Sequence, residues 1–307
     1  MDQTAVRVGV RRRPRLADAA ERAGSVHPAG QRRRGDRRRR VRRPQRRRPD
    51  PPRREPRGRL AVRRGADARR RRRDQRRAEL RPAGRSVTYD TGYISLVWNA
   101  TADGGEFVAP ETFDGLLESE YAGDLLAQNP SSSATGRAFL LHTIQAKGEE
   151  NYLDYWSDLQ ENDVRILGSW GDAYSAYGND EAPMVVSYST DQVYANRADQ
   201  DMDRHQIRFL NDQAYANPEG MAQFADTDSP GLAKSFMEFM LRPEVQAEIA
   251  VRNVAFPAIT DAEFGDEHAE YEQYAQVPPE AVSFSYDELR GNLQGWIEEW
   301  SRQIAGN

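Results

Sequence analysis

The chain contains 307 residues, of which 44 are Lys or Arg and 48 are Asp or Glu, giving a formal net charge of −4. This total combines two unlike segments. Residues 1–85 contain 33 Arg, no Lys and nine acidic residues, a net charge of +24, whereas the following 222 residues contain 11 basic and 39 acidic side chains, a net charge of −28. The absence of Cys excludes disulfides, thiolate metal sites and a cysteine nucleophile. The four His lack metal-ligand spacing, no apolar run is long enough to span a bilayer, and no secretory signal is recognisable.

The first 85 residues are rich in Arg, Pro, Gly and Ala and contain no Ile, Phe, Trp or Tyr. Such a segment cannot bury enough apolar surface to offset its chain entropy, so we predict disorder. Three interpretations fit: a basic arm that binds nucleic acid, a linker, and translation of GC-rich codons out of frame. The lack of Lys and aromatic residues favours the third, so we expect no nucleic-acid partner.

Residues 86–307 have the composition of one folded domain. A net charge of −28 with two Lys (Lys147 and Lys234) is extreme for a domain of this size. The carboxylates are spread along the whole segment, and their repulsion is tolerable when salt screens it. We therefore predict a halophilic protein.

Apolar periodicity predicts alternating strands and helices in this domain. In chain order, we predict a strand over 86–99 with a bend at Gly92, a helix over 110–117, helices over 137–148 and 152–161, a strand over 164–167, a helix over 170–177, a strand over 184–189, and helices over 191–197, 230–241, 243–251 and 286–304, while 121–128 stays ambiguous. This alternation predicts an α/β fold.

Three loops carry the candidate binding residues, and two of them follow predicted strands. NPSSSATG (129–136) places hydroxyl groups at a helix start, which predicts either an anion site or an ordinary N-cap. GSWGDAY (168–174) and SYSTDQVY (187–194) add aromatic residues beside small ones. Flat aromatic faces suit an aromatic or cationic ligand. No catalytic set emerges, so we expect no enzyme.

The order and spacing of several motifs resemble a known family. They are YDTGYISLVWN (89–99), NPSSSATGRAFLL (129–141), GSWGDAY (168–174), VSYSTDQVY (186–194), FMEFMLRPEVQAEI (236–249) and WIEEWSRQI (296–304). Over roughly 220 residues, the chain resembles the thiamine-binding subunits of ABC importers, which are type II periplasmic binding proteins. The resemblance implies an extracytoplasmic, monomeric, non-enzymatic receptor without a cofactor. Its two lobes would close on thiamine or a thiamine phosphate and deliver it to a membrane permease.

The resemblance also implies roles for individual residues. Ser133 matches a hydroxyl near the phosphate or hydroxyethyl end of the ligand, and the matching aromatic cleft walls are Trp170, Tyr188 and Tyr194. Asp90 and Tyr93 are further candidates, on a segment that crosses the hinge in the family.

Two departures from the family bear on the cleft. Val254 stands where the family has a cleft aromatic, and the Arg-rich segment stands where the first lobe begins. We therefore expect an incomplete first lobe. The alternatives are a receptor for another solute, of iron or polyamine type, and a nucleic-acid-binding protein acting through residues 1–85.

Overall fold

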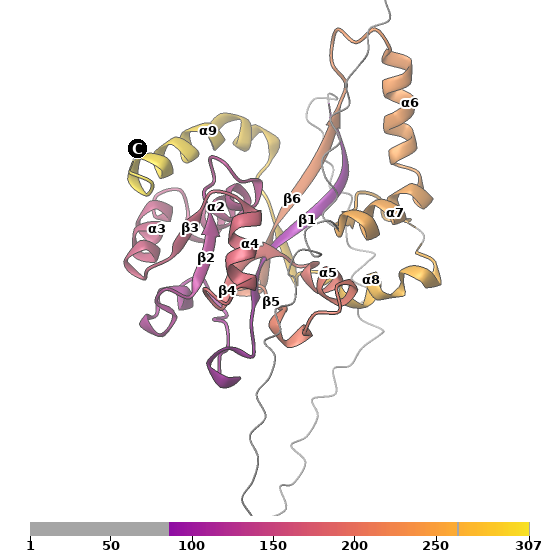
Figure 1. Ribbon diagram of the computed structural model, residues 1–307. Coiled ribbons are helices and arrows are strands. Elements are labelled where there is room, and N and C mark those ends of the chain that lie inside the picture. Colours follow the sequence, from indigo (N-terminus) through magenta and orange to yellow (C-terminus); the bar gives the residue numbers. More distant parts are fainter. Residues whose placement is uncertain (1–85, 263, 307) are drawn as a thin grey trace, which may run out of the picture. The chain divides into compact units, whose positions relative to one another are not determined.

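The computed structural model describes residues 86–262 and 264–306 (Figure 1). The disorder, the out-of-frame origin and the basic-arm alternative predicted for residues 1–85 all lie outside the described residues, and the predicted domain boundary stays a prediction.

The described chain alternates short strands with helices. The strands are β1 (Ser86–Trp98), β2 (Leu125–Gln128), β3 (Arg165–Leu167), β4 (Met184–Tyr188), β5 (Gln206–Arg208), β6 (Gln213–Ala222), β7 (Phe256–Pro257) and β8 (Glu280–Val282). The α-helices are α2 (Ala134–Lys147), α3 (Tyr152–Glu161), α4 (Trp170–Gly178), α5 (Asp191–Arg197), α6 (Pro230–Met240), α7 (Pro243–Asn253), α8 (Ala269–Tyr274) and α9 (Tyr286–Gln303). Single 3₁₀ turns lie at Ala102–Gly104, Gly115–Leu117, Ser119–Tyr121, Met202–Arg204, Leu210–Asp212 and Asp266–His268.

The sheet is mixed, in the order β3-β2-β4-β1-β6-β8, and β5 and β7 also pair with β1. β2 is parallel to both β3 and β4, whereas β1 is antiparallel to β4 and β6. The three parallel strands are followed by α2, α4 and α5, respectively. Their carboxyl ends therefore meet at one edge, where ligands of open α/β sheets collect.

β1 is the central strand of the sheet (Figure 1). Its apolar second half pairs with β4, and its first half pairs with β6. The register shifts between Thr88 and Asp90, so the irregularity does not lie at Gly92, where a bend was predicted. Glycine at position 92 instead lets the ring of Tyr188 pack directly against the backbone of β1, because a Cβ there would lie 2.6 Å from that ring.

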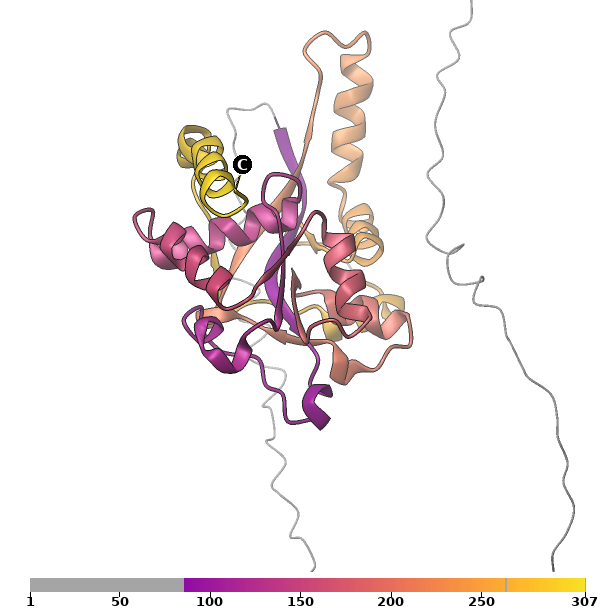
Figure 2. The same ribbon diagram turned by 60° about the vertical axis from the view of Figure 1, so that its left-hand side comes forward.

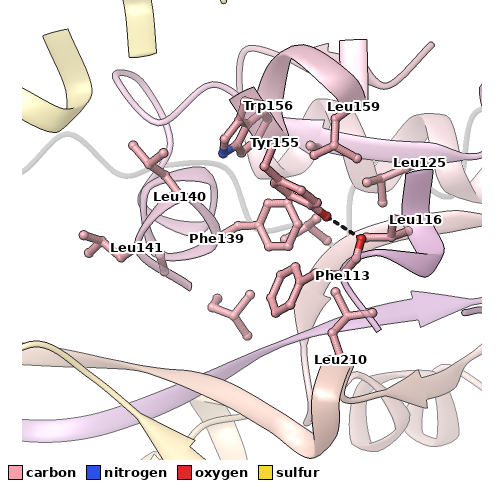
Figure 3. Close-up of a cluster of buried hydrophobic side chains, with 14 of the residues drawn as sticks. Phe113, Leu116, Leu125, Phe139, Leu140, Leu141, Tyr155, Trp156, Leu159 and Leu210 are labelled. Carbon is pink, nitrogen blue, oxygen red and sulfur yellow. Dashed lines mark hydrogen bonds between the residues drawn. The ribbon is translucent and has the colours of Figure 1, made fainter. Parts of the chain in front are cut away.

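Leucine and aromatic side chains fill the main core (Figure 3). Phe113 and Phe139 pack with Tyr155, whose hydroxyl donates to the Phe113 carbonyl oxygen at 2.9 Å. Trp156 of α3 meets Trp300 of α9 edge to face, with ring centroids 5.3 Å apart. Edge-to-face pairs of this kind stabilise a core beyond their buried area. These contacts hold α2, α3 and α9 in fixed positions beside the sheet (Figure 2).

Most predicted elements agree with the structure, and two differences have clear causes. The predicted helix over 110–117 is wrong: only Gly115–Leu117 forms a 3₁₀ turn. The Phe113 amide donates to the side chain of Asn211 at 3.1 Å, outside any helical hydrogen bond. β6 was missed because Pro218 and Gly220 interrupt its strand pattern.

The apolar side of α6 has no covering layer among the described residues. Leu232, Phe236 and Phe239 follow helical spacing, yet all three are exposed. Contiguous exposed apolar surface is uncommon in soluble monomers.

Candidate functional site

The loops that follow the parallel strands are joined by hydrogen bonds. The Asn129 amide donates to the carbonyl oxygen of Leu167 at 2.8 Å, and the Ser132 hydroxyl donates to that of Gly168 at 2.6 Å. The loop after β2 and the loop after β3 therefore form one edge, from which α2 and α4 begin.

Three rings at this edge form what we call the aromatic wall: Trp170 and Tyr174 of α4, and Tyr194 of α5. Trp170 and Tyr174 stack with centroids 4.9 Å apart and planes 28° apart, and Tyr194 meets Tyr174 edge to face at 6.2 Å. Trp170 and Tyr194 are 39% and 48% exposed. The indole N–H of Trp170 donates to Ser187 Oγ at 3.0 Å, which fixes the ring plane. The wall thus presents oriented aromatic surface to solvent.

A buried carboxylate lies behind the aromatic wall. The Tyr174 hydroxyl donates to Asp191 Oδ1 at 2.6 Å, and Asp191 Oδ2 lies 2.7 Å from His205 Nδ1. Burial, with the nearby Asp191 carboxylate, holds the pKa of Tyr174 well above its usual value, so its hydroxyl stays protonated and donates. The face of an aromatic ring attracts cations, and a carboxylate behind it adds to that attraction.

Tyr188 does not belong to the aromatic wall. Neighbouring residues of a strand point to opposite faces, so Tyr188 faces α2 while Ser187 faces Trp170. The Tyr188 hydroxyl lies 3.1 Å from Thr135 Oγ1 and accepts from Asn217 Nδ2 at 3.4 Å. Burial raises the pKa of Tyr188. This tyrosine is half-buried between the start of α2 and β6.

Ser133 caps α2. It is buried, and its Oγ accepts from the Gly136 amide at 3.3 Å. Gly136 is required there because a Cβ would lie 2.3 Å from the Gln128 carbonyl oxygen. The ordinary N-cap, one of the two predicted interpretations, is what the geometry shows. A contact of Ser133 with an anion stays a prediction.

Asp90 and Tyr93 lie on β1 beside the segment that contains Val254. Asp90 is 1% exposed, accepts from Asn253 Nδ2 at 2.6 Å, and has no partner for its Oδ1. Burial raises the Asp90 pKa to about 6, although the hydrogen bond from Asn253 opposes the shift. The Tyr93 ring packs against Phe256 at 4.9 Å. Among the described residues, no hydrogen bond or ring contact joins this pair to the aromatic wall.

The structure thus brings Trp170 and Tyr194 together through Tyr174, places Ser133 at the start of α2 on the same edge, and places Tyr188, Asp90 and Tyr93 elsewhere. Tyr174, Asp191 and His205 were not predicted. Tyr174 could have been found, since it follows Trp170 by four residues and therefore shares its helix face. The pairing of Asp191 with His205 carries no sequence signal.

The described residues offer neither a metal site nor a membrane-spanning helix. Within residues 86–262 and 264–306, no three His, Asp or Glu side chains are grouped so that they could hold a metal ion. No helix among the same residues is both long and apolar enough to cross a membrane.

Comparison with known proteins identifies the family. Residues 68–281 match the family described as bacterial extracellular solute-binding protein. The thiamine-binding periplasmic protein of Salmonella typhimurium is 26% identical over 219 residues, which cover 71% of this chain and 64% of that protein. Its counterpart from Brucella abortus is 28% identical, with 70% and 62% covered. The chain therefore spans less than two thirds of the length of these relatives.

Solved structures show the same fold. A periplasmic thiamin binding protein superimposes with a TM-score of 0.62 at 24% identity, covering 72% of this chain and 66% of that one. A ferric binding protein from Campylobacter jejuni gives 0.58 at 16% identity, with 73% and 71% covered. With its periplasmic-binding-protein fold and a family match over residues 68–281, the chain belongs to the bacterial extracellular solute-binding proteins.

Proposed function

We propose that the chain is the solute-binding component of an ABC importer, and that its solute is thiamine or a thiamine phosphate. Family membership and two relatives named for thiamine binding support this assignment. The receptor would work outside the cytoplasm, as a monomer and without catalysis, and would deliver the solute to a membrane permease.

The aromatic wall is the observation that carries the proposal. Thiamine combines a cationic thiazolium ring with an aromatic pyrimidine. A cation over an aromatic face gains about 0.5–2 kcal/mol, depending on how far the pair is desolvated. The buried Asp191 carboxylate behind Tyr174 and the acidity of the whole domain favour a positively charged ligand.

An iron receptor is less well supported, although a ferric binding protein shares the fold. The part of the chain that the structure describes lacks a group of three His, Asp or Glu side chains that could hold the ion. A polyamine has positive charge but no flat ring, so competition between thiamine and spermidine separates these two solutes.

Calorimetric titration of the full chain with thiamine, thiamine monophosphate and spermidine tests the proposal. We expect Trp170→Ala to weaken thiamine binding about tenfold, because a loss of about 1.4 kcal/mol corresponds to that factor. Tyr286→Ala is the matched control, since Tyr286 is an aromatic residue of α9, 42% exposed and outside the wall. If spermidine bound as tightly as thiamine, and if Trp170→Ala left thiamine binding unchanged, the assignment of thiamine as the solute would be wrong.

A further inference from the structure

A groove of about 740 Å³ lies between α9 and the start of α2, away from the aromatic wall. Its apolar residues are Leu289, Leu293 and Ile297 of α9. Three arginines also line it, Arg137 of α2 and Arg290 and Arg302 of α9, against a single carboxylate, Glu298. We call this surface the basic groove.

The charges of the basic groove are unusual for this domain. Residues 86–307 contain 11 Lys and Arg, all within the described part, and seven of them pair with a carboxylate. Of the four described cations without such a pair, three line the groove. The fourth, Arg242, lies over the Phe239 ring. In a segment with a net charge of −28, unpaired cations are therefore concentrated at one place.

The basic groove follows the axis of α9, with a row of apolar side chains between two arginines. Leu289, Leu293 and Ile297 recur every four residues along α9, and Arg290 and Arg302 stand at either end of this row. Twelve residues of helix span about 18 Å. At one end, Ser301 Oγ lies 2.8 Å from Ser131 Oγ of the loop before α2. A compact ion could not meet both Arg290 and Arg302, whereas a segment of several helical turns could meet both ends at once.

We propose that the basic groove docks an acidic amphipathic helix of a partner protein. Apolar side chains of the partner, spaced by three and four residues, would lie along the row from Leu289 to Ile297. Its carboxylates would pair with Arg290 and Arg302 at the two ends, and with Arg137 on the opposite wall. The inference does not depend on the identity of the solute, because the aromatic wall lies on other elements.

The absence of Cys allows a local measurement. Gln294, which lines the groove, is replaced by Gln294→Cys in the full chain and labelled with an environment-sensitive fluorophore. The probe is a synthetic peptide of about 14 residues, or four helical turns, with Leu on one face and Glu on the other. A scrambled peptide of the same composition controls for attraction to the Arg-rich segment. Titrations use the lowest salt concentration at which circular dichroism shows a folded protein.

We expect the patterned peptide to change the fluorescence saturably and the scrambled peptide to do so far less. Arg290→Glu combined with Arg302→Glu should weaken the response about tenfold, whereas Arg242→Glu, with a similar unpaired charge outside the groove, should leave it unchanged. If the double variant does not fold, Arg290→Gln combined with Arg302→Gln replaces it.

Three results would overturn the proposal: equal responses to both peptides, a double variant that binds like the parent, or a response to inorganic phosphate with none to the peptide. The last result would assign the groove to small anions.

Discussion

Asp90 offers a direct test of how the first half of β1 is packed. Its side chain is almost fully buried, with one oxygen bonded to Asn253 and the other without a partner. Burial raises its pKa from 3.8 to about 6. Between these values the folded state binds more protons than the unfolded state, so stability is highest below the window and is lost as the pH rises through it.

The size of this effect follows from the shift. Each pKa unit corresponds to about 1.4 kcal/mol, so the ionisation of Asp90 lowers the free energy of unfolding by about 3 kcal/mol in total, of which about 2.4 kcal/mol falls between pH 4 and pH 8. Asp90→Asn keeps the shape and can still accept from Asn253, but it carries no charge. We therefore expect the variant to be more stable than the parent at pH 8, and this advantage to shrink toward pH 4.

Urea unfolding of the full chain at constant salt, followed by circular dichroism between pH 4 and pH 8, measures the difference between variant and parent. Asp226→Asn, at an exposed carboxylate, is the control and should show no such trend. A difference that stays constant with pH, or a variant less stable than the parent at pH 8, would refute the burial of an ionisable Asp90.

Two further predictions concern α2 and the aromatic wall. Gly136→Ala should destabilise the protein by about 1–3 kcal/mol, because the added Cβ would lie 2.3 Å from a backbone oxygen. Gly291→Ala is the control in α9, where the space around the glycine is open, and it should stabilise the protein by about 0.5–1 kcal/mol. Urea unfolding compares the two variants, and equal effects would contradict the packing around Gly136. Tyr174→Phe should cost about 1–3 kcal/mol, because it removes a donor from a buried carboxylate, while Tyr194→Phe should cost nothing measurable in the same assay. A neutral Tyr174→Phe would contradict the hydrogen bond.

Local patterns were enough to predict much of the fold. The β-branched run of β1, the apolar run of β4 and the helices α2 to α7 and α9 follow from neighbours in sequence, whereas α8 was not predicted. β6 does not, because a strand that contains Pro218 and Gly220 forms only through pairing with β1, to which it is distant in sequence. Its existence depends on tertiary contacts that no local window contains.

The candidate site could be predicted only in part for the same reason. Trp170 and Tyr194 follow strand ends, and the sequence places both at one edge of the sheet. Tyr188 is the last residue of β4, and its direction depends on strand alternation and on the space left by Gly92. The burial of Asp90 depends on β7, two residues that pair with β1. These features are set by long-range register, which motif spacing does not encode.

The out-of-frame origin predicted for the Arg-rich segment has its own test. Translation of the nucleotide sequence around codon 85 in all three frames should reveal a family-like first lobe in another frame. A continuous Arg-rich frame with no such alternative would contradict this interpretation and favour a linker or a basic arm.

The proposed solute site is tested most directly by tryptophan fluorescence. The chain has five Trp, and Trp170, at 39%, is the most exposed of those that the structure describes. Thiamine stacked on the aromatic wall should quench its emission saturably in the full chain, and Trp170→Phe, which keeps a ring but removes the indole, should abolish that quenching. Quenching of the same size in both proteins, or none in either, would contradict the proposal that this wall binds thiamine.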